Sequence, residues 1–171
     1  MIFPRISVSR SIALAITLAF APVTTPIGSL FAQAPSNLPF VKQHIYSETT
    51  NPHADIAAAL SQASKEHKRV LLDFGGDWCG DCQVLDIYFH QHPNAQLLAR
   101  HFVVVHIDIG HMDHNVDVAN RYKVPINKGV PALAVLDAHG KIVYSQANGE
   151  FENMRNMNAQ SVTDFLNRWK G

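Results

Sequence analysis

The chain has 171 residues, of which 14 are Lys or Arg, 14 are Asp or Glu, and 47% are hydrophobic. This length and apolar content predict one folded domain and exclude an intrinsically disordered chain. The balanced charge argues against a basic surface for nucleic acid, and the two cysteines are too few for a disulfide scaffold or a four-thiolate zinc site.

The beginning of the chain has the pattern of a secretory signal. Two arginines and no acid precede an apolar run of 12 residues from Ile12 to Val23, and small and polar residues follow it. A spanning helix needs about 20 apolar residues. We therefore expect residues 1–32 to be a signal peptide, cleaved after Ala32 or Ala34, with an uncleaved membrane anchor as the alternative. A signal implies a periplasmic or secreted protein, in a compartment where two cysteines can form a disulfide.

The remaining chain alternates predicted helices with predicted buried strands, and Asp73 is the polar residue near the end of the first strand. The predicted elements are a leader over 33–50, a helix over 55–67, a strand over 69–74, a helix after the cysteines that breaks near His92, a helix over 95–101, a strand over 102–109, a helix over 116–122, strands over 132–136 and 141–145, and a helix over 161–169. This order predicts a single α/β domain over residues 51–171, with a mixed central sheet flanked by helices.

The most specific motif is Trp78-Cys79-Gly80-Asp81-Cys82, a CxxC between a buried strand and the first turn of a helix. Free amides and the positive end of the helix dipole favour a thiolate at the first cysteine. We therefore predict that Cys79 is the nucleophile and Cys82 the resolving thiol. Gly80 and Asp81 lie between them and tune the redox potential, and the negative charge of Asp81 opposes the thiolate and lowers that potential.

Two other interpretations of the cysteines remain open. A bridge between Cys79 and Cys82 could simply staple the fold, but closing so short a loop contributes only about 2 kcal/mol, against about 3 for fifteen residues. Alternatively, the two thiols could bind copper or zinc together with histidines. His111 and His114 flank Asp113 and could form a metal site only if a third ligand came from elsewhere.

The segments LLDFGGDWCGDC and GVPALAVLDAHGKIV resemble the active-site segment and the proline loop of the thioredoxin superfamily. The resemblance covers residues 52–171 and is greatest to the secreted carboxy-terminal domain of DsbD-type electron carriers. It implies a thioredoxin fold, a three-layer α/β/α sandwich, and thiol-disulfide exchange without a cofactor or a bound metal.

The resemblance also assigns roles to residues outside the CxxC. Pro131 after Val130 matches the cis-proline that offers backbone groups to an incoming polypeptide, and Trp78 borders the same substrate-binding surface. Asp73 matches the buried acid beneath the resolving cysteine, and there it is expected to take a proton from Cys82 as the mixed disulfide resolves.

Three positions depart from the family pattern. Gly75 replaces an aromatic residue, which predicts a more open site. The strand lysine that accompanies the buried acid falls at Val104, which leaves Asp73 without that lysine as a partner. Residues 125–127 are an insertion before the proline loop, and this loop is therefore expected to differ in shape.

The sequence therefore predicts a protein-disulfide reductase or electron relay of the cell envelope. Its partners would be disulfide-containing proteins and a membrane thiol carrier as electron donor, and the protein is expected to be a monomer. The alternatives are a copper or zinc handling protein that uses the same thiols, and a redox-inactive adaptor with a thioredoxin fold.

Overall fold

The computed structural model describes residues 41–171. The predicted signal peptide, its cleavage site and the first part of the leader lie outside the described residues. Within the described part, none of the helices combines the length and the apolar character needed to cross a membrane.

The secondary structure follows the predicted order, with ends that differ by at most a few residues. The helices and strands are α1 (Pro52–Glu66), β1 (Arg69–Gly75), α2 (Gly80–His90), α3 (Asn94–His101), β2 (Phe102–Asp108), α4 (Val116–Arg121), η1 (Ile126–Lys128), β3 (Ala132–Leu136), β4 (Ile142–Ser145), η2 (Met154–Asn156) and α5 (Ala159–Trp169). The two 3-10 helices, η1 and η2, were not predicted, and η1 overlaps the predicted insertion.

Local sequence explains two of the helix boundaries. The side chain of Asn51 accepts hydrogen bonds from the amides of His53 and Ala54, and Pro52 needs no amide partner at the first helical position, so α1 starts earlier than predicted. The predicted break near His92 is present between α2 and α3, where Pro93 has no amide to continue the helical bonding.

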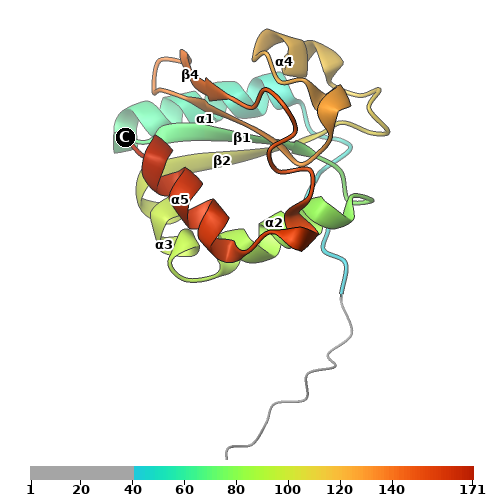
Figure 1. The fold of residues 1–171 in the computed structure, drawn as a ribbon. Helices are drawn as coiled ribbons and strands as arrows, with labels where there is room; N and C mark the ends of the chain where they lie inside the picture. Colours follow the sequence, from blue (N-terminus) through green and yellow to red (C-terminus); the bar gives the residue numbers. More distant parts are fainter. Residues whose placement is uncertain (1–40) are drawn as a thin grey trace, which may run out of the picture. The chain divides into compact units, whose positions relative to one another are not determined.

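The four strands form one mixed sheet in the order β2-β1-β3-β4. Strand β1 is parallel to β2 and antiparallel to β3, and β4 completes a hairpin with β3. Helices α1 and α4 lie on one side of the sheet and α2, α3 and α5 on the other (Figure 1). The predicted α/β fold with three layers is therefore confirmed.

The sheet order brings the CxxC and the proline loop to the same edge. Strand β1 is central and ends at Gly75, shortly before α2 begins. Because β1 and β3 are antiparallel with Phe74 opposite Ala132, the end of β1 lies beside the start of β3. The proline loop immediately before β3 is thus placed next to the cysteines.

Residues 43–46, the last part of the leader, bind to Asp77 just before the CxxC and to Gln83 just after it. We call residues 43–46 the strap. The amides of Ile45 and Tyr46 donate to Oδ1 of Asp77, at 2.8 and 3.0 Å. Gln43 and Gln83 exchange two bonds, from the Gln43 amide to Oε1 of Gln83 at 2.8 Å and from Nε2 of Gln83 to the Gln43 carbonyl at 2.9 Å. The strap therefore packs with the domain rather than preceding it as a separate leader.

Asp77 makes the attachment of the strap dependent on pH. Burial raises the pKa of Asp77, but the amides of Tyr46 and Ile45 and the ring of His44 outweigh burial and hold it below the ordinary value of 3.8. A group with a lowered pKa stabilises the folded state fully above its ordinary pKa, and this contribution is lost as the pH falls through the lowered value. We expect the wild type to lose more unfolding free energy between about pH 5 and pH 3 than Asp77→Asn, in urea titrations. Equal losses in the two proteins would contradict this role of Asp77.

Candidate active site

A disulfide joins Cys79 to Cys82, whose Cα atoms are 5.2 Å apart. Cys79 is the N-cap of α2, with an extended backbone, and its Sγ accepts a hydrogen bond from the amide of Cys82 at 3.1 Å. The exposed fraction is 5% for Cys79 and 0% for Cys82. An incoming disulfide can therefore reach Cys79 first.

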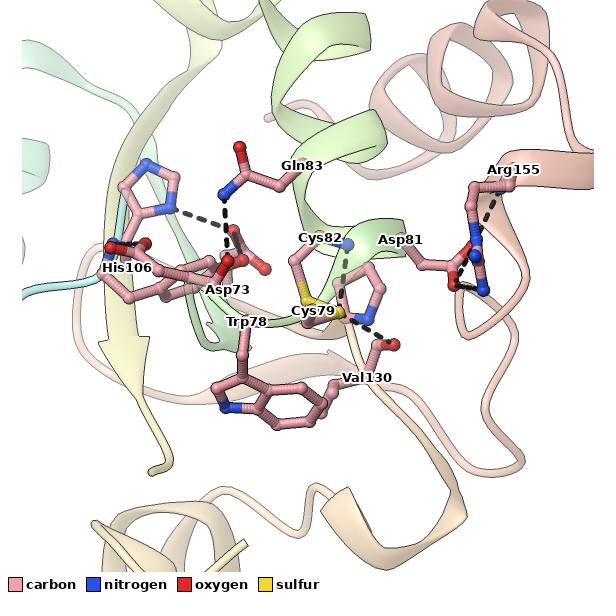
Figure 2. The surroundings of a disulfide bond; sticks show 12 residues. Asp73, Trp78, Cys79, Asp81, Cys82, Gln83, His106, Val130 and Arg155 are labelled. Atoms are coloured by element: carbon pink, nitrogen blue, oxygen red, sulfur yellow. Dashed lines mark hydrogen bonds and ion pairs between the residues drawn. A yellow bond between two sulfur atoms is a disulfide. The ribbon is translucent and has the colours of Figure 1, made fainter. Parts of the chain in front are cut away.

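The proline loop lies against Cys79. The carbonyl oxygen of Val130 is 3.5 Å from Sγ of Cys79, and the peptide bond between Val130 and Pro131 is cis, as the family resemblance implies (Figure 2). A carbonyl oxygen is the negative end of its dipole, so this contact opposes a negative charge on the sulfur. It partly offsets the stabilisation that the helix start provides.

Trp78 is a large apolar side chain held at the surface beside Cys79. Its exposed fraction is 45%, yet its position is fixed: Nε1 donates to the carbonyl of Gly110 at 2.6 Å, and the ring stacks on His111 with centroids 5.5 Å apart. A fixed aromatic surface beside the reactive sulfur suits contact with a polypeptide.

Asp81 is not the isolated negative charge that the sequence suggested. Its Oδ1 accepts the amide of Arg155 at 2.9 Å, and its Oδ2 accepts Nε of Arg155 at 3.0 Å and contacts Nη2 at 2.9 Å. Arg155 comes from η2, 74 residues away in the chain. Figure 2 shows its side chain bound to the Asp81 carboxylate beside α2. Arg155 therefore provides a counter-charge for the Asp81 carboxylate. Gly80, the first residue of α2, lies next to the side chain of Arg155.

Asp73 lacks the family's strand lysine, as Val104 indicated, but a different basic side chain, His106, lies beside it. The parallel register of β1 and β2 sets Asp73 opposite His106, two residues beyond Val104. Asp73 is 2% exposed, and its Oδ2 is 2.9 Å from Nδ1 of His106 and 2.9 Å from the hydroxyl of Tyr46.

His106 is the counter-charge of this buried acid. Burial lowers the pKa of His106, but the hydrogen bond and charge of Asp73, together with the charge of Asp86, outweigh burial and raise it above the ordinary 6.5. The protonated imidazole is therefore favoured beside the carboxylate.

The expected opening at Gly75 is also absent, because Tyr46 of the strap fills it. A Cβ atom on Gly75 would lie 2.6 Å from both Cζ and the hydroxyl of Tyr46, and 2.8 Å from Sγ of Cys82. Sequence reasoning missed Tyr46, since it belongs to a segment without helical or strand periodicity. The only signal was the missing aromatic at Gly75, whose volume a distant side chain supplies.

The histidines considered as metal ligands do not form a metal-binding cluster. His111, Asp113 and His114 line a surface hollow beside Trp78. Across residues 41–171, no group of three or more His, Cys, Asp or Glu side chains is arranged to hold a metal ion.

Comparison with known proteins agrees with this geometry. A family model described as thioredoxin-like matches residues 51–138, which is more than half of the chain. The chain belongs to the thioredoxin-like family. No curated protein matches it significantly.

Several solved structures resemble this thioredoxin-like protein. A disulphide isomerase from Xylella fastidiosa Temecula1 is 36% identical, with a TM-score of 0.71 and coverage of 75% of this chain and 98% of that chain. A thioredoxin from Thermus thermophilus is 18% identical, with a TM-score of 0.49 and coverage of 75% and 87%. The DsbD carboxy-terminal domain of Neisseria meningitidis, in its oxidised form, is 19% identical, with a TM-score of 0.44 and coverage of 68% and 94%.

The thioredoxin-like fold and the disulfide between Cys79 and Cys82 together form the centre of a thiol-disulfide oxidoreductase. The helix start, the proline loop and the buried acid surround this centre from three separate parts of the chain.

The pair of Asp81 and Arg155 gives a test of the charge balance at Cys79. Arg155→Gln leaves the Asp81 carboxylate without a counter-charge, which disfavours the thiolate and makes the reduction potential more negative. Asp81→Asn leaves Arg155 unopposed and shifts the potential the other way. Each shift corresponds to about 30 mV for each pKa unit of the Cys79 thiol.

Equilibration with glutathione measures both shifts. Arg168→Gln, which removes an exposed arginine on α5, is the matched control and should keep the wild-type potential. Shifts of the same sign in Arg155→Gln and Asp81→Asn would show that the pair does not balance charge at Cys79.

Proposed function

We propose that the protein reduces disulfides in other proteins, or relays electrons to them, in the cell envelope. The observation that carries the proposal is the position of Cys79, at the start of α2, more exposed than Cys82, and in contact with the proline loop. The envelope location is supported by the signal pattern of residues 1–32.

The reaction uses the two sulfurs in sequence. The Cys79 thiolate attacks one sulfur of a substrate disulfide, which forms a mixed disulfide and releases the other substrate sulfur as a thiolate. Cys82 then loses its proton, attacks Sγ of Cys79, and displaces the second substrate sulfur. The substrate gains two electrons and two protons, and the protein is left with the disulfide between Cys79 and Cys82.

The surface around Cys79 favours a polypeptide substrate. The exposed ring of Trp78 and the carbonyl of Val130 both lie near the sulfur of Cys79 (Figure 2). Next to Trp78 is a hollow of about 400 Å³ that is lined by polar and charged side chains, among them Asp77, Asp108 and His111. An extended chain could lie across the tryptophan and the proline loop, with its disulfide over Cys79.

The surroundings of Cys79 favour a reductant over a strong oxidant. A strong oxidant of this chemistry has a heavily stabilised thiolate in its reduced form. Here the sulfur accepts the amide of Cys82 but faces the carbonyl of Val130, and the positive charge of Arg155, which would favour a thiolate, is cancelled by Asp81. A reductant in an oxidising compartment needs a supply of electrons, which a membrane thiol carrier would provide.

The similar protein from Xylella fastidiosa suggests a second candidate function, because it is named a disulphide isomerase. An isomerase uses the same attack by Cys79, but the substrate rearranges its own disulfides before Cys82 resolves the intermediate. If the protein reactivates a substrate with scrambled disulfides without consuming an added reductant, this result would favour isomerisation over net reduction.

Cysteine variants test the proposal. Cys79→Ser should abolish the reduction of insulin by the protein, since no accessible nucleophile remains. Cys82→Ser should still attack and should accumulate a mixed disulfide at Cys79, which mass spectrometry detects after acid quenching. The wild type should show both attack and turnover.

Two results would contradict the proposal. One is a Cys79→Ser protein that reduces insulin as fast as the wild type. The other is a Cys82→Ser protein that forms no adduct with oxidised glutathione or with insulin, because the first step needs only Cys79.

A further inference from the structure

The two oxygens of the buried Asp73 have different surroundings. Oδ2 is 2.9 Å from the Tyr46 hydroxyl and 2.9 Å from Nδ1 of His106. Oδ1 is buried and has no hydrogen-bond partner within residues 41–171. A buried carboxylate oxygen without a partner is costly, so its persistence points to a task.

The carboxylate belongs to the surroundings of Cys82. The Tyr46 hydroxyl and Sγ of Cys82 both lie within 2.8 Å of the place where a Cβ of Gly75 would stand. Figure 2 shows Asp73 between His106 and the disulfide in that view. Tyr46 therefore contacts both the acid and the neighbourhood of the resolving sulfur.

We propose that Tyr46 and His106 are positioning residues for the resolving step, holding Oδ2 of Asp73 so that Oδ1 stays free to accept the proton of Cys82. This inference rests on the proposed thiol-disulfide exchange. It adds a residue of the strap and a residue of β2 to the site, and neither was part of the sequence prediction.

The resolving step consists of a proton transfer from Cys82 to Asp73, followed by a thiol-disulfide exchange. In the mixed disulfide, the Cys82 thiol gives its proton to Oδ1 of Asp73, and its sulfur becomes a thiolate. That thiolate attacks Sγ of Cys79, and the substrate leaves as a thiolate. Asp73 then releases its proton to solvent before the next cycle, while the hydroxyl and the imidazole continue to hold Oδ2.

Both holding groups favour the ionised carboxylate. A hydroxyl that donates to the oxygen and a protonated imidazole beside it each stabilise the negative charge. Other groups also face His106, and they belong to neighbouring elements: Asp86 and His90 on α2 and Asp55 on α1. These groups are unchanged in the variants below, so their effect is common to all of them.

The test follows the resolving step by rapid acid quenching. The reduced protein is mixed with oxidised glutathione, and mass spectrometry separates the glutathione adduct from the resolved disulfide over a range of pH. In Tyr46→Phe and His106→Gln, the pH of half-maximal resolution should rise, because each variant removes one group that stabilises negative charge on Oδ2 of Asp73. Below that pH, resolution should be about tenfold slower than in the wild type, as expected from the loss of one charge-assisted interaction.

Matched variants separate this role from a general effect on folding. Tyr122→Phe removes the hydroxyl of another buried tyrosine, and His139→Gln removes an exposed histidine of the β3–β4 turn; both should keep the wild-type profile. The rate at which Cys79 forms the adduct in a Cys82→Ser background should also be unchanged by Tyr46→Phe and His106→Gln.

The experiment distinguishes a failure of the positioning role from a failure of the proposed function. If the wild type and the control variants resolve the adduct, and Tyr46→Phe and His106→Gln do so with the wild-type pH profile, the positioning role is wrong and the proposed function stands. If the reduced wild type forms neither the adduct nor the disulfide with oxidised glutathione, the proposed function fails and the inference fails with it.

Discussion

Strands β1 and β2 pair in a single parallel register, and this register places His106 opposite Asp73. A carboxylate that is 2% exposed could not remain charged in the core without donors and a counter-charge. His106 and Tyr46 provide both at one oxygen. The same register brings β1 to its end at Gly75, just before the CxxC, so the buried acid and the reactive cysteines have a fixed separation along one strand and the following turn.

Electrostatic balance is the common theme of the site. Near Cys79, the amide of Cys82 favours a thiolate and the carbonyl of Val130 opposes it, while Arg155 neutralises the acid between the cysteines. Deeper in the fold, His106 has the same relation to Asp73 as Arg155 has to Asp81. Neither sulfur therefore faces an isolated charge, and this balance supports the proposal that the dithiol is a reductant rather than a strong oxidant.

The sequence was informative where the signal is local and less so where it depends on distant segments. Apolar runs and the CxxC at a strand-helix junction predicted the elements and the position of Cys79, because each signal is contained within a few residues. Tyr46, His106 and Arg155 could not be assigned in this way. Their partners are 27, 33 and 74 residues away, and a shift of two residues in strand register separates Val104 from His106.

We propose that the pair of Cys79 and Cys82 is a reducing dithiol, and the reduction potential of this pair tests the proposal most directly. Equilibration of the protein with glutathione, with the thiol fraction read by alkylation and mass spectrometry, should give a potential close to that of thioredoxin, at about −270 mV. A value of about −120 mV, the range of a dedicated oxidant, would contradict a reducing role for this dithiol.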